Sequence, residues 1–290
     1  MTRIGAVSYL NTLPLVHGMQ QGLAAERIDL SFATPAVLAD RMAAGELDLA
    51  LLPIVELARI PDLEIVPGLG IVTEGACRSV LLVSKKPPAE IASLALDPDS
   101  RTSNILSQVL LAEVWKRRPE VVDGSRQLDD SLQRADATVR IGDKALFEPC
   151  PDGARVEDLG QVWTRETGLP FVFAVWVARA GATDRPLYQL LHASRRAGKQ
   201  AIERIAADYR WNGTPQPEIA RSYLEENIRF RLGADELRAM RLFFAAAAGL
   251  GLIDAAPELR MAFERWTTCH ETAAEQELIE RPTGESNHAG

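Results

Sequence analysis

The chain has 290 residues, of which 47% are hydrophobic and 25% charged, and its formal net charge is −8 at pH 7. These values are typical of a globular protein with one large or two ordinary domains, and they exclude a largely disordered chain. The acidic balance argues against a nucleic-acid partner and against an anionic membrane surface.

The beginning of the chain lacks the charged and apolar regions of a secretory signal, and the longest apolar stretch, 242–253, is too short to span a bilayer. Three widely spaced cysteines, Cys77, Cys150 and Cys269, predict free thiols and neither a disulfide framework nor a zinc site. We therefore expect a cytoplasmic protein. The sequence does not indicate its oligomeric state.

The first part of the chain predicts an alternation of strands and helices. Apolar runs at 3–8 and 47–53, and the alternating stretch 28–32, are typical of strands. Helices are expected after the first run and, from Pro35 to Gly45, after the second strand. The resulting β-α-β-α-β order favours a parallel sheet.

A second α/β set is expected between two further apolar runs, at 79–84 and 171–178. Its elements are a strand, two helices and another strand, at 93–96, 103–117, 129–135 and 137–141. After Arg179 the pattern indicates helices only, at 187–209, 218–231 and 235–250. The tail after His270 is polar and acidic, and we expect it to be mobile.

This order predicts a discontinuous first lobe into which a second lobe is inserted. Lobe I comprises 1–84 plus 179–290 with the C-terminal helices, and lobe II comprises 85–178. Two connecting segments between the lobes would form a hinge, and the lobes would enclose a ligand cleft. The predicted fold class is therefore α/β, with the two-lobed, type II periplasmic-binding-protein-like organisation.

Polar side chains gather where the predicted strands end, which is where open α/β sheets bind ligands. The segment 99–104 offers three hydroxyls and a guanidinium at a helix start, where free N–H groups attract a carboxylate or phosphate. Ordinary helix capping by Asn11, Thr12 or Asp143 is the alternative interpretation. Gly142 would let the backbone approach a ligand closely. The candidate substrate-binding residues are Ser8, Tyr9, Ser100, Arg101, Thr102, Ser103, Gly142 and Asp143.

Several signatures of catalytic or cofactor sites are absent from the sequence. It contains no dinucleotide-binding glycine motif, no phosphate-binding Walker loop, no nucleophile elbow and no zinc-binding helix motif. The four histidines, His17, His192, His270 and His288, do not cluster in a ligand spacing. We therefore expect neither a metal site nor a cofactor.

Six segments resemble the chorismate dehydratase family of the futalosine route to menaquinone. They are SYLNTLPL at 8–15, GELDLALLP at 45–53, SVLL at 79–82, SRTS at 100–103, IGD at 141–143 and TGLPFVFA at 167–174. The likeness runs in order from Arg3 to about Leu250. The opening motif and the run at 167–174 are its most specific parts, whereas 75–78 departs from the pattern, so the resemblance assigns no ligand role to Cys77 or Arg78.

The resemblance implies a binding-protein fold and a hydro-lyase that removes water from chorismate to give 3-[(1-carboxyvinyl)oxy]benzoate. It also implies that Asn11 and Ser79 carry the activity and that the segment 100–103 holds a substrate carboxylate. No motif supplies a protein base near C3 of the substrate. Our hypothesis is that the enolpyruvyl carboxylate of chorismate takes the proton itself, oriented by Asn11 and Ser79, while His17, Glu56 and Asp143 are the protein alternatives.

Two other functions stay open at this point. A sister enzyme, the dihydroxynaphthoate synthase of the same route, shares the fold, but its family uses a histidine in the second lobe and this chain has none between His17 and His192. A non-catalytic solute-binding or sensor protein for a small carboxylate is the second alternative, because most proteins of this fold bind without catalysis.

Overall fold

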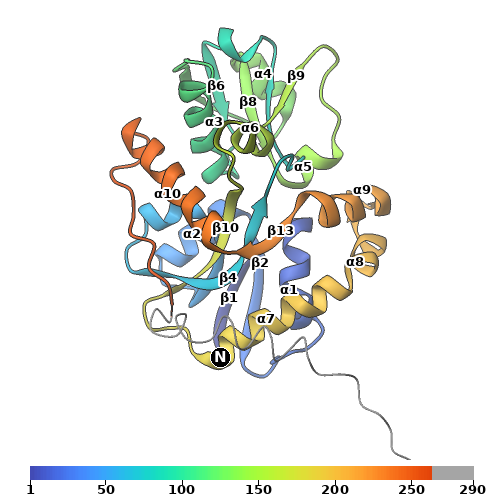
Figure 1. Ribbon diagram of the computed structural model, residues 1–290. Coiled ribbons are helices and arrows are strands. Elements are labelled where there is room, and N and C mark those ends of the chain that lie inside the picture. The colour runs from blue at the N-terminus through green and yellow to red at the C-terminus, as the bar shows by residue number, and fades with distance from the viewer. Residues whose placement is uncertain (263–290) are drawn as a thin grey trace, which may run out of the picture.

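The computed structural model describes residues 1–262, which contain two large β-sheets, one above the other in Figure 1, and a two-stranded hairpin. The six-stranded sheet has the order β13-β4-β10-β3-β1-β2. Its strands are β1 (Thr2–Val7), β2 (Ile28–Ala33), β3 (Leu49–Pro53), β4 (Leu63–Thr73), β10 (Phe171–Arg179) and β13 (Arg229–Leu232). β1 pairs in parallel with β2 and β3, whereas β10 is antiparallel to both β3 and β4.

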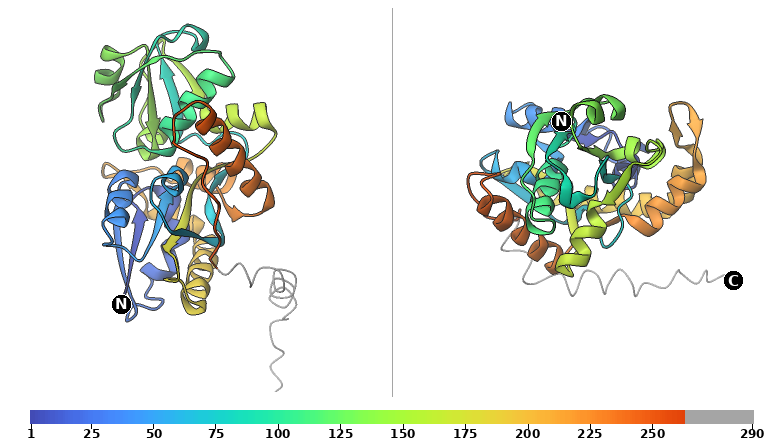
Figure 2. Two further views of the ribbon diagram at one scale, coloured as in Figure 1. Left: turned by 90° about the vertical axis from the view of Figure 1, so that its left-hand side faces the viewer. Right: turned by 90° about the horizontal axis from the view of Figure 1, so that it is seen from above.

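Helices from the N-terminal and C-terminal parts of the chain surround this sheet, and α8 and α9 lie to one side of it (Figures 1 and 2). They are α1 (Leu13–Gln20), α2 (Pro35–Ala43), α7 (Arg185–Gln200), α8 (Ile202–Asp208), α9 (Pro217–Ser222) and α10 (Ala234–Gly249). A short hairpin, β11 (Arg210–Trp211) and β12 (Thr214–Pro215), lies between α8 and α9. None of the helices described in residues 1–262 is long and apolar enough to cross a membrane.

The second sheet has five strands in the order β7-β6-β8-β5-β9. The strands are β5 (Val80–Ser84), β6 (Ser93–Leu96), β7 (Glu120–Asp123), β8 (Ala137–Ile141) and β9 (Arg155–Asp158). The accompanying helices are α3 (Thr102–Glu113), α4 (Leu128–Arg134), α5 (Gly142–Phe147) and α6 (Leu159–Thr167). β6 and β8 are parallel, so their carboxyl ends lie at the same edge of the sheet.

Local chemistry explains the two elements that matter most for the site. β3 consists of Leu-Ala-Leu-Leu-Pro and is buried throughout, as a strand covered on both faces must be. Pro53 then ends it, because proline cannot donate to a sheet ladder. α3 begins at Thr102 and has no side-chain cap, so the backbone N–H groups of its first turn have no partner within the helix.

The strand pairing moves the predicted lobe boundaries. β5 was assigned to lobe I by the sequence, but it pairs with β8 and β9 in the five-stranded sheet. β10 was assigned to the inserted lobe, but it lies in the middle of the six-stranded sheet. The division into two lobes stays a prediction, and we propose that its boundaries lie at the two crossing segments between the sheets, 74–79 and 168–170.

The prediction of helices only after Arg179 is wrong, because the hairpin of β11 and β12 and the strand β13 lie in this part of the chain. The expected helix at 187–209 is interrupted at Ala201, between α7 and α8. The expected helix at 218–231 ends early, and β13 follows it and pairs with β4. Arg229-Phe230-Arg231-Leu232 alternates exposed arginine with buried apolar residues, which is the two-residue period of a strand. The expected mobile tail after His270 lies outside the described residues.

The α1–α7 contact depends on glycine. A Cβ atom on Gly198 would lie 1.9 Å from the carbonyl oxygen of Pro14, and one on Gly18 would lie 2.6 Å from Cα of Ser194. The two helices therefore approach each other more closely than any side chain at these positions allows. Because α1 follows the first strand end, this contact also sets the position of the segment that precedes α1.

Gly198→Ala should therefore destabilise the fold by about 2 kcal/mol or more, because overpacked cores must shift backbone or side chains. Gly249→Ala is the matched control, since a Cβ atom there would meet nothing within 4 Å and alanine favours helix. Urea denaturation of both variants measures the free energies of unfolding. Equal stability of the two variants would contradict the close helix contact.

Candidate functional site

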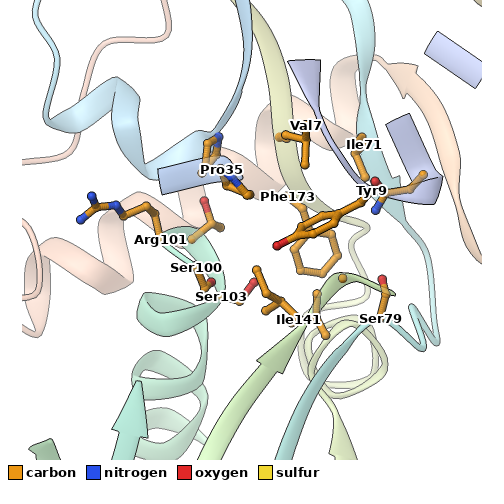
Figure 3. A pocket seen from close by; sticks show the side chains of 16 residues that line it. Val7, Tyr9, Pro35, Ile71, Ser79, Ser100, Arg101, Ser103, Ile141 and Phe173 are labelled. Carbon is orange, nitrogen blue, oxygen red and sulfur yellow. The ribbon is translucent and has the colours of Figure 1, made fainter. Parts of the chain in front are cut away.

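A cavity lies between the two sheets, at the carboxyl ends of β1, β3 and β8, with an empty volume of about 530 Å³ counted to its open mouth. Eight of its lining residues are apolar: Val7, Pro35, Pro53, Ile71, Val80, Ile141, Phe173 and Ala174. Figure 3 shows Tyr9 and Phe173 in the middle of the cavity, with Ser79 toward one end and Ser100 and Ser103 toward the other. The cavity therefore suits a flat apolar body with polar groups at both ends.

The first polar end is the start of α3. Ser100, Thr102 and Ser103 are all buried there and line the cavity. The unpaired N–H groups of the first turn carry the positive end of the helix dipole, which favours a bound anion. The hydroxyl oxygen of Thr102 also accepts a hydrogen bond of 3.2 Å from the backbone N–H of Val55, so this end is tied to the other sheet.

Arg101 lies at this end but its guanidinium is held by acidic side chains. Nη2 is 3.3 Å from Oδ1 of Asp40, and Nε is 3.9 Å from Oε1 of Glu56. Figure 3 shows the Arg101 side chain directed away from Tyr9 and Phe173. Burial raises the pKa of Glu56, and the two arginines near it, Arg59 and Arg101, oppose that rise. The guanidinium therefore contributes less positive charge to the cavity than the sequence pattern indicates.

Tyr9 rests against a glycine. A Cβ atom on Gly142 would lie 2.8 Å from the ring of Tyr9, and Gly142 has φ of +65°, so only glycine fits both requirements. Among the described residues the buried hydroxyl of Tyr9 has no hydrogen-bond partner. Burial, reinforced by the nearby carboxylates of Asp97 and Asp99, raises the pKa of Tyr9. The phenol therefore keeps its proton and is a donor available to a ligand.

The second polar end joins Asn11, Ser79 and Tyr223. Asn11 lies in the short helical turn Leu10–Thr12 after β1, and Ser79 immediately precedes β5. Nδ2 of Asn11 donates to the hydroxyl oxygen of Tyr223 at 3.0 Å, and that hydroxyl donates to Oγ of Ser79 at 2.7 Å. The carbonyl of Ser79 accepts the N–H of Gly142 at 2.8 Å, which fixes Ser79 beside the end of β8.

Asp143 does not line the cavity, but it hydrogen-bonds to a residue next to the lining. Its buried carboxylate accepts the backbone N–H of Leu10 at 3.1 Å and the hydroxyl of Tyr209 at 2.6 Å. Burial raises its pKa to about 6, although both hydrogen bonds favour the charged form. Asp143 lies in α5, which directly follows β8 of the five-stranded sheet, whereas Leu10 follows β1 of the six-stranded sheet. The hydrogen bond between them therefore joins the two halves of the site.

Ser8 also lies away from the cavity. It is exposed, and its N–H donates to the carbonyl of Ala33, which continues the pairing of β1 with β2. Strand alternation explains this, because Val7 and Tyr9 face the cavity and the residue between them must face the other way. Eight predicted site residues do line the cavity: Tyr9, Asn11, Ser79, Ser100, Arg101, Thr102, Ser103 and Gly142.

Cys77 and Arg78 lie in the crossing segment and face away from the cavity. The carboxylate of Asp158 accepts their two backbone N–H groups, at 3.1 and 2.6 Å. Burial raises the pKa of the Cys77 thiol well above its ordinary value, so the thiol stays protonated. The Arg78 guanidinium donates to Oγ of Ser222 at 3.0 Å. These contacts hold the crossing segment and place neither side chain among the lining residues.

Sequence reasoning missed Tyr223. It follows α9 in a π-helical turn, Tyr223–Asn227, within a stretch that the sequence indicated as ordinary helix. No motif or strand end marks this position, so the sequence offers no local signal for it. In the described part of the chain, no group of three or more His, Cys, Asp or Glu side chains is placed to hold a metal ion.

A family model and two curated relatives agree on the family to which the chain is similar. A family model described as menaquinone biosynthesis matches residues 2–249. The chain is 30% identical to the chorismate dehydratase of Thermus thermophilus, with 85% of this chain and 95% of that protein covered. It is 27% identical to the chorismate dehydratase of Campylobacter jejuni, with 86% and 98% covered.

Comparison with solved structures concerns the fold. A protein from Archaeoglobus fulgidus matches with a TM-score of 0.71 at 15% identity, covering 87% of this chain and 98% of that one. The alkanesulfonate-binding protein of Xanthomonas axonopodis pv. citri, bound to MOPS, matches with a TM-score of 0.58 at 17% identity, covering 90% and 95%. The predicted periplasmic-binding-protein-like α/β fold is therefore confirmed.

The raised pKa of Asp143 makes a prediction about pH. The folded pKa of about 6 exceeds the ordinary value of 3.8, so between these values the folded state binds a proton that the unfolded state has released. Stability contributed by this residue therefore falls as pH rises through that window, by about 3 kcal/mol in total.

The measurement is the free energy of unfolding of the wild type minus that of Asp143→Asn, from urea denaturation at pH 4 to 7. We expect this difference to favour the wild type most at pH 4 and to decline steadily to pH 7. A difference that stays constant or increases over this range would show that the hydrogen bonds from Tyr209 and Leu10 outweigh burial.

Proposed function

The chain belongs to the menaquinone biosynthesis family, and from that premise we propose that it removes water from chorismate to give 3-[(1-carboxyvinyl)oxy]benzoate. The observation that carries this proposal is the match to two chorismate dehydratases over most of both chains. The cavity supports it, because an apolar middle separates two polar ends that suit a ring bearing two carboxylates. The reaction is a redox-neutral elimination, so we assign a hydro-lyase.

Each polar end would take one carboxylate. The start of α3, with Ser100 and Ser103, supplies hydroxyls and unpaired N–H groups, and the hydroxyl of Tyr9 points toward these serines in Figure 3. Asn11 and Ser79 supply an amide and a hydroxyl at the other end. These donors are neutral and held in place, so they stabilise developing negative charge without reorganising.

The elimination begins with loss of the proton at C3 of the ring. The electrons left behind are delocalised through the ring double bond onto the ring carboxylate, and they then expel hydroxide from C4. The C3–H and C4–O bonds break, the ring becomes aromatic, and the proton and hydroxide leave as water. Stabilising the negative charge at the ring carboxylate therefore lowers the barrier, which is the role we propose for the start of α3.

The base that takes the C3 proton is the remaining requirement. Among the described residues that line the cavity there is no Asp, Glu or His. We therefore keep the substrate's enolpyruvyl carboxylate as the base, with Asn11 and Ser79 orienting it, since it is tethered to C3 through the ether oxygen and one vinyl carbon. Glu56 and Asp143 are buried outside the lining, Asp143 accepts hydrogen bonds from Leu10 and Tyr209, and His17 lies in α1.

The direct test is incubation of the purified protein with chorismate, followed by ultraviolet absorbance and mass analysis of the product. A benzoate product lighter than chorismate by one water is the expected result. Saturable binding of chorismate without product would instead establish the solute-binding alternative.

We also propose that the protein acts in the cytoplasm, where its substrate would be a free metabolite.

Asn11→Ala and Ser79→Ala test the proposed catalytic pair. Each should lower kcat by about 100-fold, as loss of one preorganised donor does. Ser84→Ala is the matched control, because Ser84 lies at the other end of β5 and its buried hydroxyl donates to the carbonyl of Lys86. Steady-state kinetics with chorismate measure all three variants, and the control should retain its turnover.

Full activity in both Asn11→Ala and Ser79→Ala would reject their proposed roles. Loss of kcat on Glu56→Gln or His17→Gln, with the pair intact, would identify a protein base instead of the substrate carboxylate.

A further inference from the structure

The phenol of Tyr223 is the buried meeting point of the two residues proposed to act on the substrate. Its side chain is 1% exposed, and its oxygen contacts Nδ2 of Asn11 and Oγ of Ser79. The three residues come from the beginning, the first crossing segment and the C-terminal part of the chain. Tyr223 does not line the cavity, so it can act on the substrate only through these two neighbours.

The hydrogen bonds in this group have a defined direction. An amide nitrogen can only donate, so the Tyr223 oxygen accepts from Asn11 and its one proton goes to Ser79. Burial raises the pKa of Tyr223, so the phenol retains that proton. The Ser79 oxygen therefore accepts from Tyr223, and its own proton is available to an acceptor in the cavity.

The turn that carries Tyr223 is fastened to the crossing segment that carries Ser79. The guanidinium of Arg78 donates to Oγ of Ser222, the residue before Tyr223. At the other end of the turn, Nδ2 of Asn227 donates to the carbonyl of Ala76 at 2.9 Å, and the carbonyl of Asn227 accepts the hydroxyl of Thr73 at 3.0 Å. The phenol and the serine hydroxyl are thus held as one unit.

We propose that Tyr223 is a positioning residue which orders the hydrogen bonds from Asn11 through Ser79, so that Ser79 presents its proton to the substrate carboxylate. This inference rests on the proposed chorismate dehydration. Without the phenol, the Ser79 hydroxyl can turn and donate elsewhere, and the amide of Asn11 loses the acceptor that fixes its orientation. The carboxylate would then be bound but misaligned with C3.

Tyr223→Phe removes only the hydroxyl and keeps the ring. We expect kcat for chorismate to fall about 10- to 100-fold, because misplacement of a reacting group costs that much, while KM changes by less than about threefold. Ser131→Ala is the matched control. Its buried hydroxyl accepts the N–H of Ser125 and does not line the cavity, so this variant loses an equivalent hydrogen bond and should keep its kcat. Melting temperatures of both variants report folding.

A double-mutant cycle separates positioning from a merely structural role. If Tyr223 acts through Ser79 and Asn11, adding Tyr223→Phe to the Asn11→Ala, Ser79→Ala double variant should lower the residual single-turnover rate by less than about twofold. A structural role would reduce that rate by the same factor as in the wild type, and this result would overturn the inference. So would a Tyr223→Phe single variant with wild-type kcat.

Arg78→Ala provides a second variant should Tyr223→Phe fail to fold. It leaves the three hydrogen-bonding residues in place but removes the hydrogen bond to Ser222 at one end of the turn, and kcat should again fall more than KM changes. Unchanged kcat in Arg78→Ala would then count against the inference. Failure of the wild type to convert chorismate would overturn the proposed function itself, whereas an active wild type with active Tyr223→Phe would overturn only the role of Tyr223.

Discussion

The site depends on one buried hydrogen-bonded group, in which the phenol of Tyr223 joins Asn11 to Ser79. Buried polar atoms need partners, and these three satisfy one another while leaving the serine proton directed outward. The group also brings together a residue that follows β1, a residue that precedes β5 and a turn that precedes β13. The same hydrogen bonds therefore hold the two sheets relative to each other and orient the polar groups of the site. Asp143 and Thr102 add ties between the sheets at other points around the cavity.

The cationic side chains near the cavity form ion pairs with carboxylates, and this determines the electrostatics of the cavity. The chain carries a net charge of −8, and the guanidinium of Arg101 lies within ion-pair distance of Asp40 and Glu56. Lys144 likewise forms ion pairs with Asp97 and Asp99, the carboxylates that act on Tyr9. Neutral hydroxyls, an amide and the start of α3 therefore carry the interaction with an anion. Such donors bind more weakly than an arginine pair, but they hold charge in a fixed geometry, which is what a change of charge during reaction requires.

Most of the cavity could be predicted from the sequence because it is built at strand ends. Tyr9, Asn11, Ser79 and Gly142 adjoin the ends of predicted strands, and the residues 100–103 begin a predicted helix. Ser8 could have been excluded by strand alternation alone. Tyr223 could not be found in this way, because its role arises only when a distant turn packs against the crossing segment. The sequence does not indicate β13, because the strand has only four residues and directly follows a helical stretch. Over a long window, the helical period of that stretch hides the two-residue period of the strand.

The place of β10 between β3 and β4 affects the order in which a nascent chain can fold. The five-stranded sheet uses only residues 80–158, so all its strands are available as soon as that stretch has been synthesised. The other sheet must wait for β10 and then for β13. Until then the fully apolar β3 has an open edge, and open apolar edges are the surfaces on which partly made chains aggregate. The edge of β3 thus stays open for as long as the stretch between β4 and β10 is being made.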